Sequence, residues 1–324
     1  MCAIFGLLDF KGELTAWERL RIIRALGKAS EVRGTDATGI ACVQNGVVRI
    51  QKAPRPARWM QYRIPSEARY IMGHTRMATQ GAAGKNFNNH PFPGKAGKLP
   101  FALAHNGVLY NDLELQRTYR LPRTKIETDS YVAVQLIERE GELTAKSLKV
   151  MAEVLEGTFT FTVLDGKNNL YFVKGNNPLT IYLLPNLGCY IYASTKEILD
   201  AALAALGLAA VSRTTIAISQ GDIMQIDCTG RRAVSRFDDT KLSFLDYYGG
   251  FGSWRRPIRT CCTCKEDDYL EEVVQYGLSR GVPEAELHLL INAGYDALDL
   301  EELLYDAPLR ANCVQEIVSD LGVC

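Results

Sequence analysis

Met1-Cys2-Ala3-Ile4-Phe5-Gly6 opens the chain. Because Cys2 is small, we expect the initiator Met1 to be removed, which would make Cys2 the N-terminal residue. Such a cysteine carries both a thiol and a free α-amine, with pKa values of about 8.5 and about 8, and the amine can act as the base for the thiol. The apolar run over residues 3–8 predicts a buried strand that would hold the cysteine on a rigid element. A cysteine at position two can also occur by chance. Whether Cys2 is a nucleophile therefore depends on motifs elsewhere in the sequence.

Helical and strand patterns alternate along the next part of the chain. Apolar residues at helical spacing predict a helix over residues 15–30 with Thr15 as its cap, and Asn45-Gly46 predicts a hairpin between strands 40–44 and 47–51. From Thr158 onward, short strands separated by turns predominate, among them 170–174 and 189–193, with one helix at 196–206. This pattern favours antiparallel sheets over the βαβ alternation of a Rossmann domain.

A change of composition near residue 240 predicts the domain organisation. We expect a large α+β domain over residues 2–240, a linker rich in Gly, Arg and Cys over 241–265, and a small helical segment over 266–324. The expected helices of this segment cover residues 268–279, 283–291, 298–305 and 312–321. Pro283 near a helix start and a glycine after a helix end are typical of helix boundaries.

Composition and charge limit the classes of function. Lys plus Arg and Asp plus Glu both number 37 in 324 residues, so no overall field favours nucleic acid or an acidic membrane. The nine cysteines have no regular spacing and no signal peptide precedes them, which favours free thiols in a reducing, cytoplasmic compartment. The longest apolar stretch, near residues 201–210, is too short for a membrane span.

Five polar motifs occur in the first half of the chain, several of them at the ends of apolar strands, where sites commonly form. The apolar strand that begins at Tyr70 is expected to deliver His74, Thr75, Arg76 and Thr79 into a loop. They are Arg-Gly-Thr-Asp-Ala-Thr-Gly (33–39), Gly-His-Thr-Arg-Met-Ala-Thr-Gln-Gly (73–81), His90-Pro91, His105-Asn106-Gly107 and Glu-Thr-Asp-Ser (127–130). Each also has a simpler interpretation. Arg76 could form a surface ion pair, Asp129 could cap a helix, and Asn106-Gly107 could be a hairpin turn, while His74 and His105 are expected to be structural.

The order of these motifs after Cys2 resembles the class II glutamine amidotransferase domain. The resemblance covers about residues 2–240, and the glutaminase domain of glucosamine-6-phosphate synthase is the most similar member. It implies an N-terminal nucleophile hydrolase fold, an αββα four-layer sandwich with antiparallel sheets. Five motifs in one order make a specific match.

The resemblance also implies roles for individual residues. Cys2 would attack the side-chain amide of L-glutamine, and the Asn106 side chain and Gly107 backbone N–H would stabilise the oxyanion. Arg76 would bind the α-carboxylate of the substrate and Asp129 its α-ammonium. Thr79 and His90 would belong to the same pocket with less defined roles, and Arg33 would support the N-terminus.

Some residues depart from the resemblance, and no synthase pattern is present. Met77 stands where the glucosamine-synthase branch has an aromatic residue, Gln80 where it has His, and Thr35 where a larger residue is usual. We therefore expect ammonia to reach a separate synthase, with the helical segment as a docking element or a packing cap. The alternatives are a non-catalytic glutamine-binding module and a free-standing N-terminal-nucleophile amidase, and Arg76 with Asp129 argue against the amidase.

We expect no cofactor, no metal and no nucleic-acid partner. A structural zinc site needs four ligands in spaced pairs, whereas these thiols are crowded and the other candidate ligands are distant. The residues concerned are Cys261, Cys262 and Cys264, with His288, Cys313 and Cys324. The basic stretch at Trp254, Arg255, Arg256 and Arg259 is typical of a solvated linker.

Overall fold

The computed structural model describes residues 2–78, 80–242, 273–275, 277–278, 281–293, 295, 300, 303–304 and 307–320. The chain divides into two compact units, Met1–Tyr247 and Tyr248–Cys324. The expected linker lies almost entirely outside the described residues.

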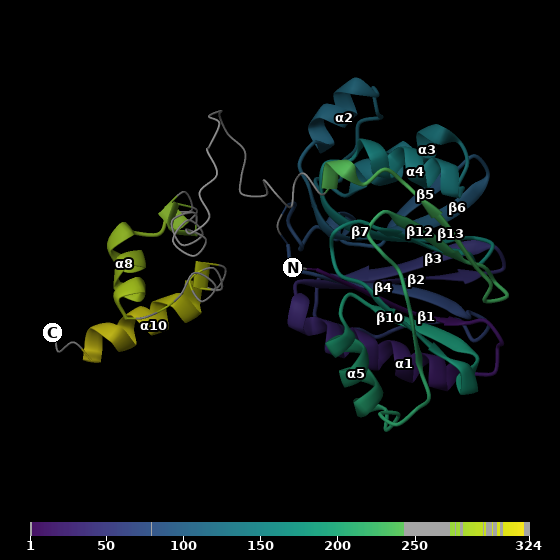
Figure 1. Cartoon of the computed structure of the whole chain (residues 1–324), viewed down its shortest axis with the longest axis horizontal. Coiled ribbons are helices and arrows are strands. Elements are labelled where there is room, and N and C mark those ends of the chain that lie inside the picture. The colour runs from purple at the N-terminus through teal and green to yellow at the C-terminus, as the bar shows by residue number, and fades with distance from the viewer. Residues whose placement is uncertain are drawn as a thin grey trace. The chain divides into compact units, whose positions relative to one another are not determined.

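Two antiparallel sheets form the centre of the first unit (Figure 1). The seven-stranded sheet has the order β11-β9-β10-β1-β4-β2-β3, and the six-stranded sheet has the order β13-β12-β8-β7-β6-β5. The strands of the first sheet are β1 (Ala3–Asp9), β2 (Ala37–Gln44), β3 (Val47–Ala53), β4 (Tyr70–Arg76), β9 (Thr180–Leu184), β10 (Cys189–Ala193) and β11 (Thr214–Ile216). Those of the second are β5 (Phe92–Ala96), β6 (Leu99–Leu109), β7 (Gly157–Asp165), β8 (Leu170–Lys174), β12 (Asp222–Ile226) and β13 (Arg232–Arg236).

Helices cover the outer face of each sheet. In Figure 1, α1 (Ala16–Ala29) and α5 (Lys196–Ala205) lie along the seven-stranded sheet, and α3 (Tyr131–Glu140) and α4 (Ala145–Val154) lie along the six-stranded sheet. The short helix α2 (Asp112–Thr118) follows β6. The expected α+β sandwich with antiparallel sheets is confirmed.

Alternation of side chains along β1 explains why this strand is apolar throughout. Ile4 and Leu8 belong to the core between the two sheets, while Phe5 and Leu7 belong to the core under α1 and α5. Because both faces of β1 are covered, every residue from Ala3 to Asp9 is buried. β1 pairs with β4 on one side and β10 on the other. Cys2, the residue before β1, is therefore held near the middle of the sheet.

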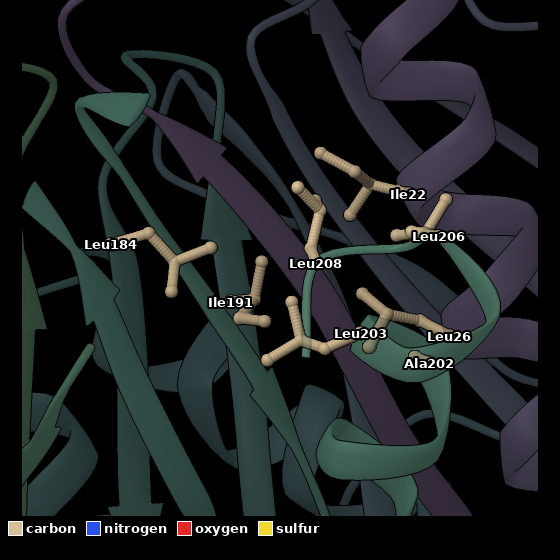
Figure 2. A pocket seen from close by; sticks show the side chains of 8 residues that line it. All are labelled: Ile22, Leu26, Leu184, Ile191, Ala202, Leu203, Leu206 and Leu208. Carbon is tan, nitrogen blue, oxygen red and sulfur yellow. The ribbon is translucent and has the colours of Figure 1, made fainter. Parts of the chain in front are cut away.

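The helices α1 and α5 meet the sheet along an apolar seam (Figure 2). The space among these side chains does not admit a water molecule, so the seam is packing rather than a site for a polar ligand. Its members come from both helices, from β9 and β10, and from the chain just after α5: Ile22, Leu26, Leu184, Ile191, Ala202, Leu203, Leu206 and Leu208.

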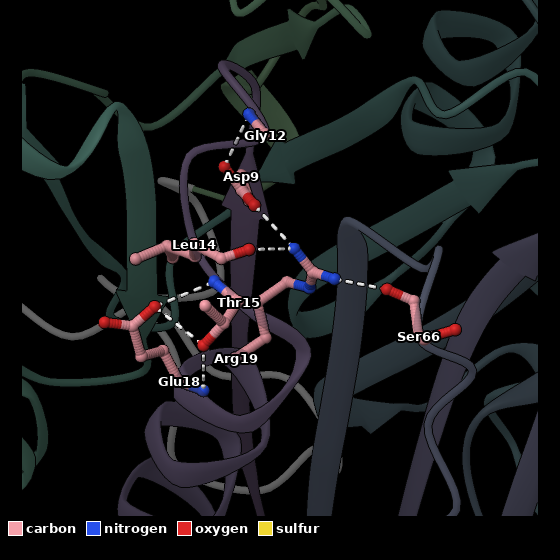
Figure 3. A network of polar contacts seen from close by, with 7 residues as sticks. All are labelled: Asp9, Gly12, Leu14, Thr15, Glu18, Arg19 and Ser66. Carbon is pink, nitrogen blue, oxygen red and sulfur yellow. Dashed lines mark hydrogen bonds and ion pairs between the residues drawn. The ribbon is translucent and has the colours of Figure 1, made fainter.

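A buried ion pair joins the end of β1 to α1 (Figure 3). Arg19 Nη1 donates to Asp9 Oδ2 at 2.9 Å, and both side chains are almost fully buried. The guanidinium also donates to the carbonyls of Leu14 and Ser66, and the other Asp9 oxygen accepts from the Gly12 N–H at 2.7 Å. Thr15 caps α1 as expected, in a capping box with Glu18.

In the second unit, two of the four expected helices can be compared with described elements. These are α8 (Glu284–Asn292) and α10 (Ala307–Asp320), which begin one and five residues away from the expected starts. Residues such as Leu287, Leu290 and Leu303 form a small apolar core there. Within the described parts of the chain, we find no helix with the length and hydropathy needed to cross a membrane.

Candidate active site

Cys2 immediately precedes β1, so the central strand of the seven-stranded sheet holds it in place. Arg33, which was expected to support the N-terminus, donates from Nε to the Cys2 carbonyl at 2.9 Å. The thiol lies 3.5 Å from the carbonyl oxygen of Met77 and is positioned to donate to it. Burial raises the pKa of the Cys2 thiol above its usual value. At neutral pH the thiol is therefore protonated and needs a base to act as a nucleophile.

Asn106 reaches the start of β1 from the other sheet. It lies within β6 and pairs with Thr160 of β7, so Asn106-Gly107 is strand and not a hairpin turn. Asn106 Nδ2 lies 3.5 Å from Ser194 Oγ, and the same oxygen accepts from the Ile4 N–H at 3.0 Å. Ser194 thus connects the Asn106 amide to the backbone two residues after Cys2.

Gly107 adopts a conformation that only glycine adopts readily. Its φ is +147°, and a Cβ at this position would lie 1.9 Å from the Thr158 carbonyl oxygen. The side-chain amide of Asn177 donates to the Asn106 carbonyl at 2.8 Å and fixes the adjacent peptide. The β6 backbone beside Asn106 is therefore held tightly, as a preorganised oxyanion site requires.

Arg76 is buried at the end of β4, rather than in the loop that was expected to carry it. Nη1 donates to Asn89 Oδ1 at 2.7 Å, and Nη2 donates to the carbonyls of Gln80 and Gly81. Both hydrogens of Nη2 are engaged. Bidentate pairing of the guanidinium with a carboxylate through Nη2 therefore requires Nη2 to release one of the two loop carbonyls. The simple interpretation of Arg76 as a surface ion-pair residue is wrong.

Asp129 is buried and accepts the Leu109 N–H at 2.6 Å from the end of β6. Its position is one residue before the N-cap of α3, which is Ser130, so Asp129 is not the cap itself. The charge of Arg76 lowers the pKa of the Cys2 thiol, and the charge of Asp129 raises it, as secondary effects beside burial. Arg76 and Asp129 therefore both lie close enough to Cys2 for their charges to act on the thiol.

Three histidines lie together behind these residues. The His74 and His90 rings are 4.3 Å apart, and His90 also lies 4.3 Å from the Phe92 ring. His74 Nε2 bonds to the His105 carbonyl at 3.0 Å, and His105 Nδ1 bonds to Ser130 Oγ at 2.8 Å. Burial lowers the pKa of His74 to about 3 and also lowers those of His90 and His105. His74 and His105 thus hold the strands together as neutral rings.

Of the two remaining expected pocket residues, the structure describes His90 but not Thr79. His90 is buried against His74 and Phe92, and neither of its ring nitrogens has a hydrogen-bond partner among the described residues. Thr79 lies outside the described residues. The structure thus brings together Cys2, Arg33, Arg76, Asn106, Gly107 and Asp129.

Two residues at the site were not among the predicted site residues. Ser194 follows β10 and lies between Ile4 and Asn106, whereas Lys52 on β3 contacts the loop that leads to His90. Neither belongs to a motif with a recognised spacing. Only the pairing of distant strands places them here.

The described residues offer no metal site, since no group of three or more His, Cys, Asp or Glu side chains among them could bind an ion. His288 and Cys313 are described, but Cys261, Cys262, Cys264 and Cys324 are not. The basic residues Trp254 to Arg259 fall outside the described part as well. The zinc and nucleic-acid interpretations therefore rest on sequence alone.

Comparison with known proteins identifies the domain. A family model described as a glutamine amidotransferase domain matches residues 74–201. Two curated relatives are the glutamine–fructose-6-phosphate aminotransferases (isomerizing) of Sulfolobus acidocaldarius and Bacillus licheniformis. The first is 28% identical over 254 residues, 74% of this chain and 42% of the relative. The second is 32% identical over 194 residues, 57% of this chain and 31% of the relative. The chain thus spans less than half the length of these relatives.

A solved structure shows the same fold. Glutamine phosphoribosylpyrophosphate amidotransferase from B. subtilis superimposes with a TM-score of 0.59 at 22% identity, over 73% of this chain and 49% of that one. The two-sheet architecture, the matching family model and the curated relatives agree with one another. Residues 74–201 of this chain therefore match a glutamine amidotransferase domain, and the chain is homologous to part of the glutamine–fructose-6-phosphate aminotransferases.

Proposed function

We propose that this chain hydrolyses the side-chain amide of L-glutamine, with Cys2 as nucleophile after removal of Met1. The observation that carries the proposal is that Ser194 connects the Asn106 amide to Ile4, two residues after Cys2, while the charges of Arg76 and Asp129 act on the Cys2 thiol. These groups come from both sheets and supply a nucleophile, an amide donor and charges of both signs. These are the groups needed to bind a free amino acid and to hydrolyse its side-chain amide.

In the proposed reaction, the Cys2 sulfur forms a bond to the amide carbon while the free α-amine takes the thiol proton. The carbonyl oxygen becomes an oxyanion, which accepts hydrogen bonds from the Asn106 side chain and the Gly107 N–H. The C–N bond then breaks, and the nitrogen leaves as ammonia with the proton from the α-amine. Water attacks the resulting thioester, releasing glutamate and restoring the thiol.

Arg76 and Asp129 are proposed to select the substrate. Arg76 binds the α-carboxylate and Asp129 the α-ammonium, so a glutamine residue inside a peptide would lack both charged groups. Since Nη2 of Arg76 already donates to two loop carbonyls, substrate binding exchanges at least one loop contact for a carboxylate contact. Arg33 holds the Cys2 carbonyl while this happens. Thr79 and His90 remain predicted members of the pocket.

The ammonia is proposed to serve a separate synthase. The curated relatives are named as fructose-6-phosphate aminotransferases, which supports an acceptor for the nitrogen of glutamine. We also propose a reducing, cytoplasmic setting. The five cysteines that the structure describes are all free thiols, in keeping with such a compartment: Cys2, Cys42, Cys189, Cys228 and Cys313.

The direct test is glutamate release from L-glutamine by purified protein whose intact mass shows that Met1 is absent. We expect wild type and Cys228→Ala, a control at an exposed cysteine, to be equally active, and Cys2→Ala to lose at least about 10³-fold. Equal rates for Cys2→Ala and wild type would refute the mechanism. Glutamine binding by processed wild type without glutamate release would instead support the alternative of a glutamine-binding module.

A further inference from the structure

Lys52 lies at the end of β3, where its ammonium group contacts backbone carbonyls rather than a carboxylate. Nζ donates to the Asn89 carbonyl at 2.5 Å and to the Pro91 carbonyl at 3.3 Å. It also lies 5.1 Å from the centre of the Phe92 ring. Among the described residues, no acidic side chain pairs with it. The Lys52 ammonium group therefore contacts one short segment, residues 89–92.

Placing the Lys52 ammonium group in these surroundings costs free energy. The side chain is half-buried, and burial, together with the charge of Arg76, lowers the pKa of Lys52 to about 8. The other charged or titratable groups that face it are His74 and His90, whose pKa values it helps to lower. A partly desolvated ammonium beside a guanidinium persists only where its hydrogen bonds compensate.

Asn89 joins Lys52 to Arg76. Its carbonyl accepts from Lys52, and its side-chain oxygen accepts from Arg76 Nη1 at 2.7 Å. Its side-chain nitrogen donates to the Ala83 carbonyl at 2.8 Å and to Asn86 Oδ1 at 3.2 Å. All polar groups of the Asn89 side chain are thus engaged, and its position sets where the guanidinium of Arg76 can lie.

The same loop returns to the Lys52 backbone. Asn86 Nδ2 donates to the Lys52 carbonyl at 2.8 Å, so the side chain and the main chain of Lys52 both contact the segment 86–91. At its other end, the loop is held by Arg76 through the carbonyls of Gln80 and Gly81. Lys52 and Arg76 therefore fix the loop 80–91 at two points.

We propose that Lys52 is a positioning residue for glutamine binding, which acts through Asn89 to hold the loop 80–91 and Arg76 in the geometry that receives the substrate carboxylate. This inference rests on the proposed function. Lys52 itself touches neither the substrate nor Cys2. Its loss should therefore weaken glutamine binding without slowing the chemical steps at the thiol.

The kinetic test uses Lys52→Met, which keeps the apolar stem and removes the charge and the donors. Because hydrogen bonds to charged groups are among the stronger ones, we expect KM for glutamine to rise about tenfold while kcat stays within about twofold. Lys52→Arg keeps a cation with several donors and should recover most of the affinity. Lys146→Met, at an exposed lysine on α4, is the control and should leave KM unchanged.

A second readout does not depend on activity. Hydrogen exchange of the amides in residues 82–91 should speed up at least fivefold in Lys52→Met relative to wild type and Lys146→Met, with β1 unchanged. If wild type releases no glutamate, the proposed function fails, and the exchange data still test Lys52. If Lys52→Met does not fold, Asn89→Ala takes its place in both assays with the same expected results.

The outcomes separate clearly. A higher KM with faster loop exchange, both reversed in Lys52→Arg, would support the proposal. It would be overturned by unchanged KM and unchanged loop exchange in Lys52→Met, or by a fall in kcat at constant KM.

Discussion

Ser194 shows how a single hydroxyl can connect two sheets at a reaction centre. It accepts the Ile4 N–H at 3.0 Å and lies 3.5 Å from Asn106 Nδ2, while its own N–H donates to the Ile4 carbonyl at 2.9 Å. The residue is fully buried, so water cannot replace these contacts. It fixes the Asn106 amide relative to the first residues of β1.

Ser194→Ala should therefore reduce both stability and activity. The Ile4 N–H would lose its partner, which destabilises the protein by about 1–3 kcal/mol. The Asn106 amide would lose the acceptor that orients it, and we expect kcat to fall about tenfold, against about 10²–10³ for Asn106→Ala. Urea unfolding and glutamate-release kinetics measure the two effects. An unchanged kcat alongside reduced stability would show that Ser194 only supports the strand.

Elements with strong local signals were predicted closely. β1, α1, β8 and β10 agree with their expected ranges, because continuous apolar runs and a capping threonine define them. β5 was missed, since Pro93 and Gly94 interrupt its pattern. Proline is tolerated there because β5 is an edge strand. The expectation that His74, Thr75 and Arg76 lie in a loop was wrong, since β4 extends to Arg76.

Within β6, Gly107 has no room for a side chain, because a Cβ there would lie 1.9 Å from the Thr158 carbonyl oxygen. We expect Gly107→Ala to destabilise the protein by about 3 kcal/mol or more and to abolish glutamate release, because a Cβ would collide with β7. Gly141→Ala, with φ +73° and open space around it, isolates the backbone strain and should cost only about 1 kcal/mol with activity retained. Equal effects of the two variants would contradict this account of β6.

Only those site residues that belong to sequence motifs, or that open the chain, could be predicted. Cys2, Arg33, Arg76, Asn106 and Asp129 lie in ordered motifs, and the structure brings them together. Ser194 and Lys52 were not predicted as site residues, because strand pairing and loop packing place them at the site. The position of His90 is likewise a property of tertiary packing, since its ring lies between His74 and Phe92.

For the whole molecule, the three buried histidines link folding to pH. Burial lowers their pKa values in the folded state, so the unfolded chain binds more protons below its histidine pKa of about 6.5. The stabilisation is therefore complete above about pH 6.5 and is lost as the pH falls below it. Each histidine that must remain neutral contributes a slope of up to about 1.4 kcal/mol per pH unit.

His90→Phe tests this dependence, because it retains a ring at the same place and removes two nitrogens that have no hydrogen-bond partner among the described residues. We would measure the free energy of unfolding in urea at pH 7.0 and pH 5.5. Between these pH values it should fall by about 1 kcal/mol less in His90→Phe than in wild type. At pH 7 the variant should be at least as stable as wild type. His288→Phe, at an exposed position, is the control. A loss as steep in His90→Phe as in wild type would contradict the buried-histidine explanation.

The central claim is that Cys2 is the nucleophile for a glutamine side chain, and covalent labelling tests it most directly. Processed protein would be incubated with a glutamine analogue that carries an electrophilic diazoketone in place of the side-chain amide, and the adduct mapped by peptide mass. We predict one adduct per chain, on Cys2, with labelling blocked by excess L-glutamine and absent in Cys2→Ala. Labelling of another cysteine with Cys2 free, or labelling that glutamine does not reduce, would contradict the account.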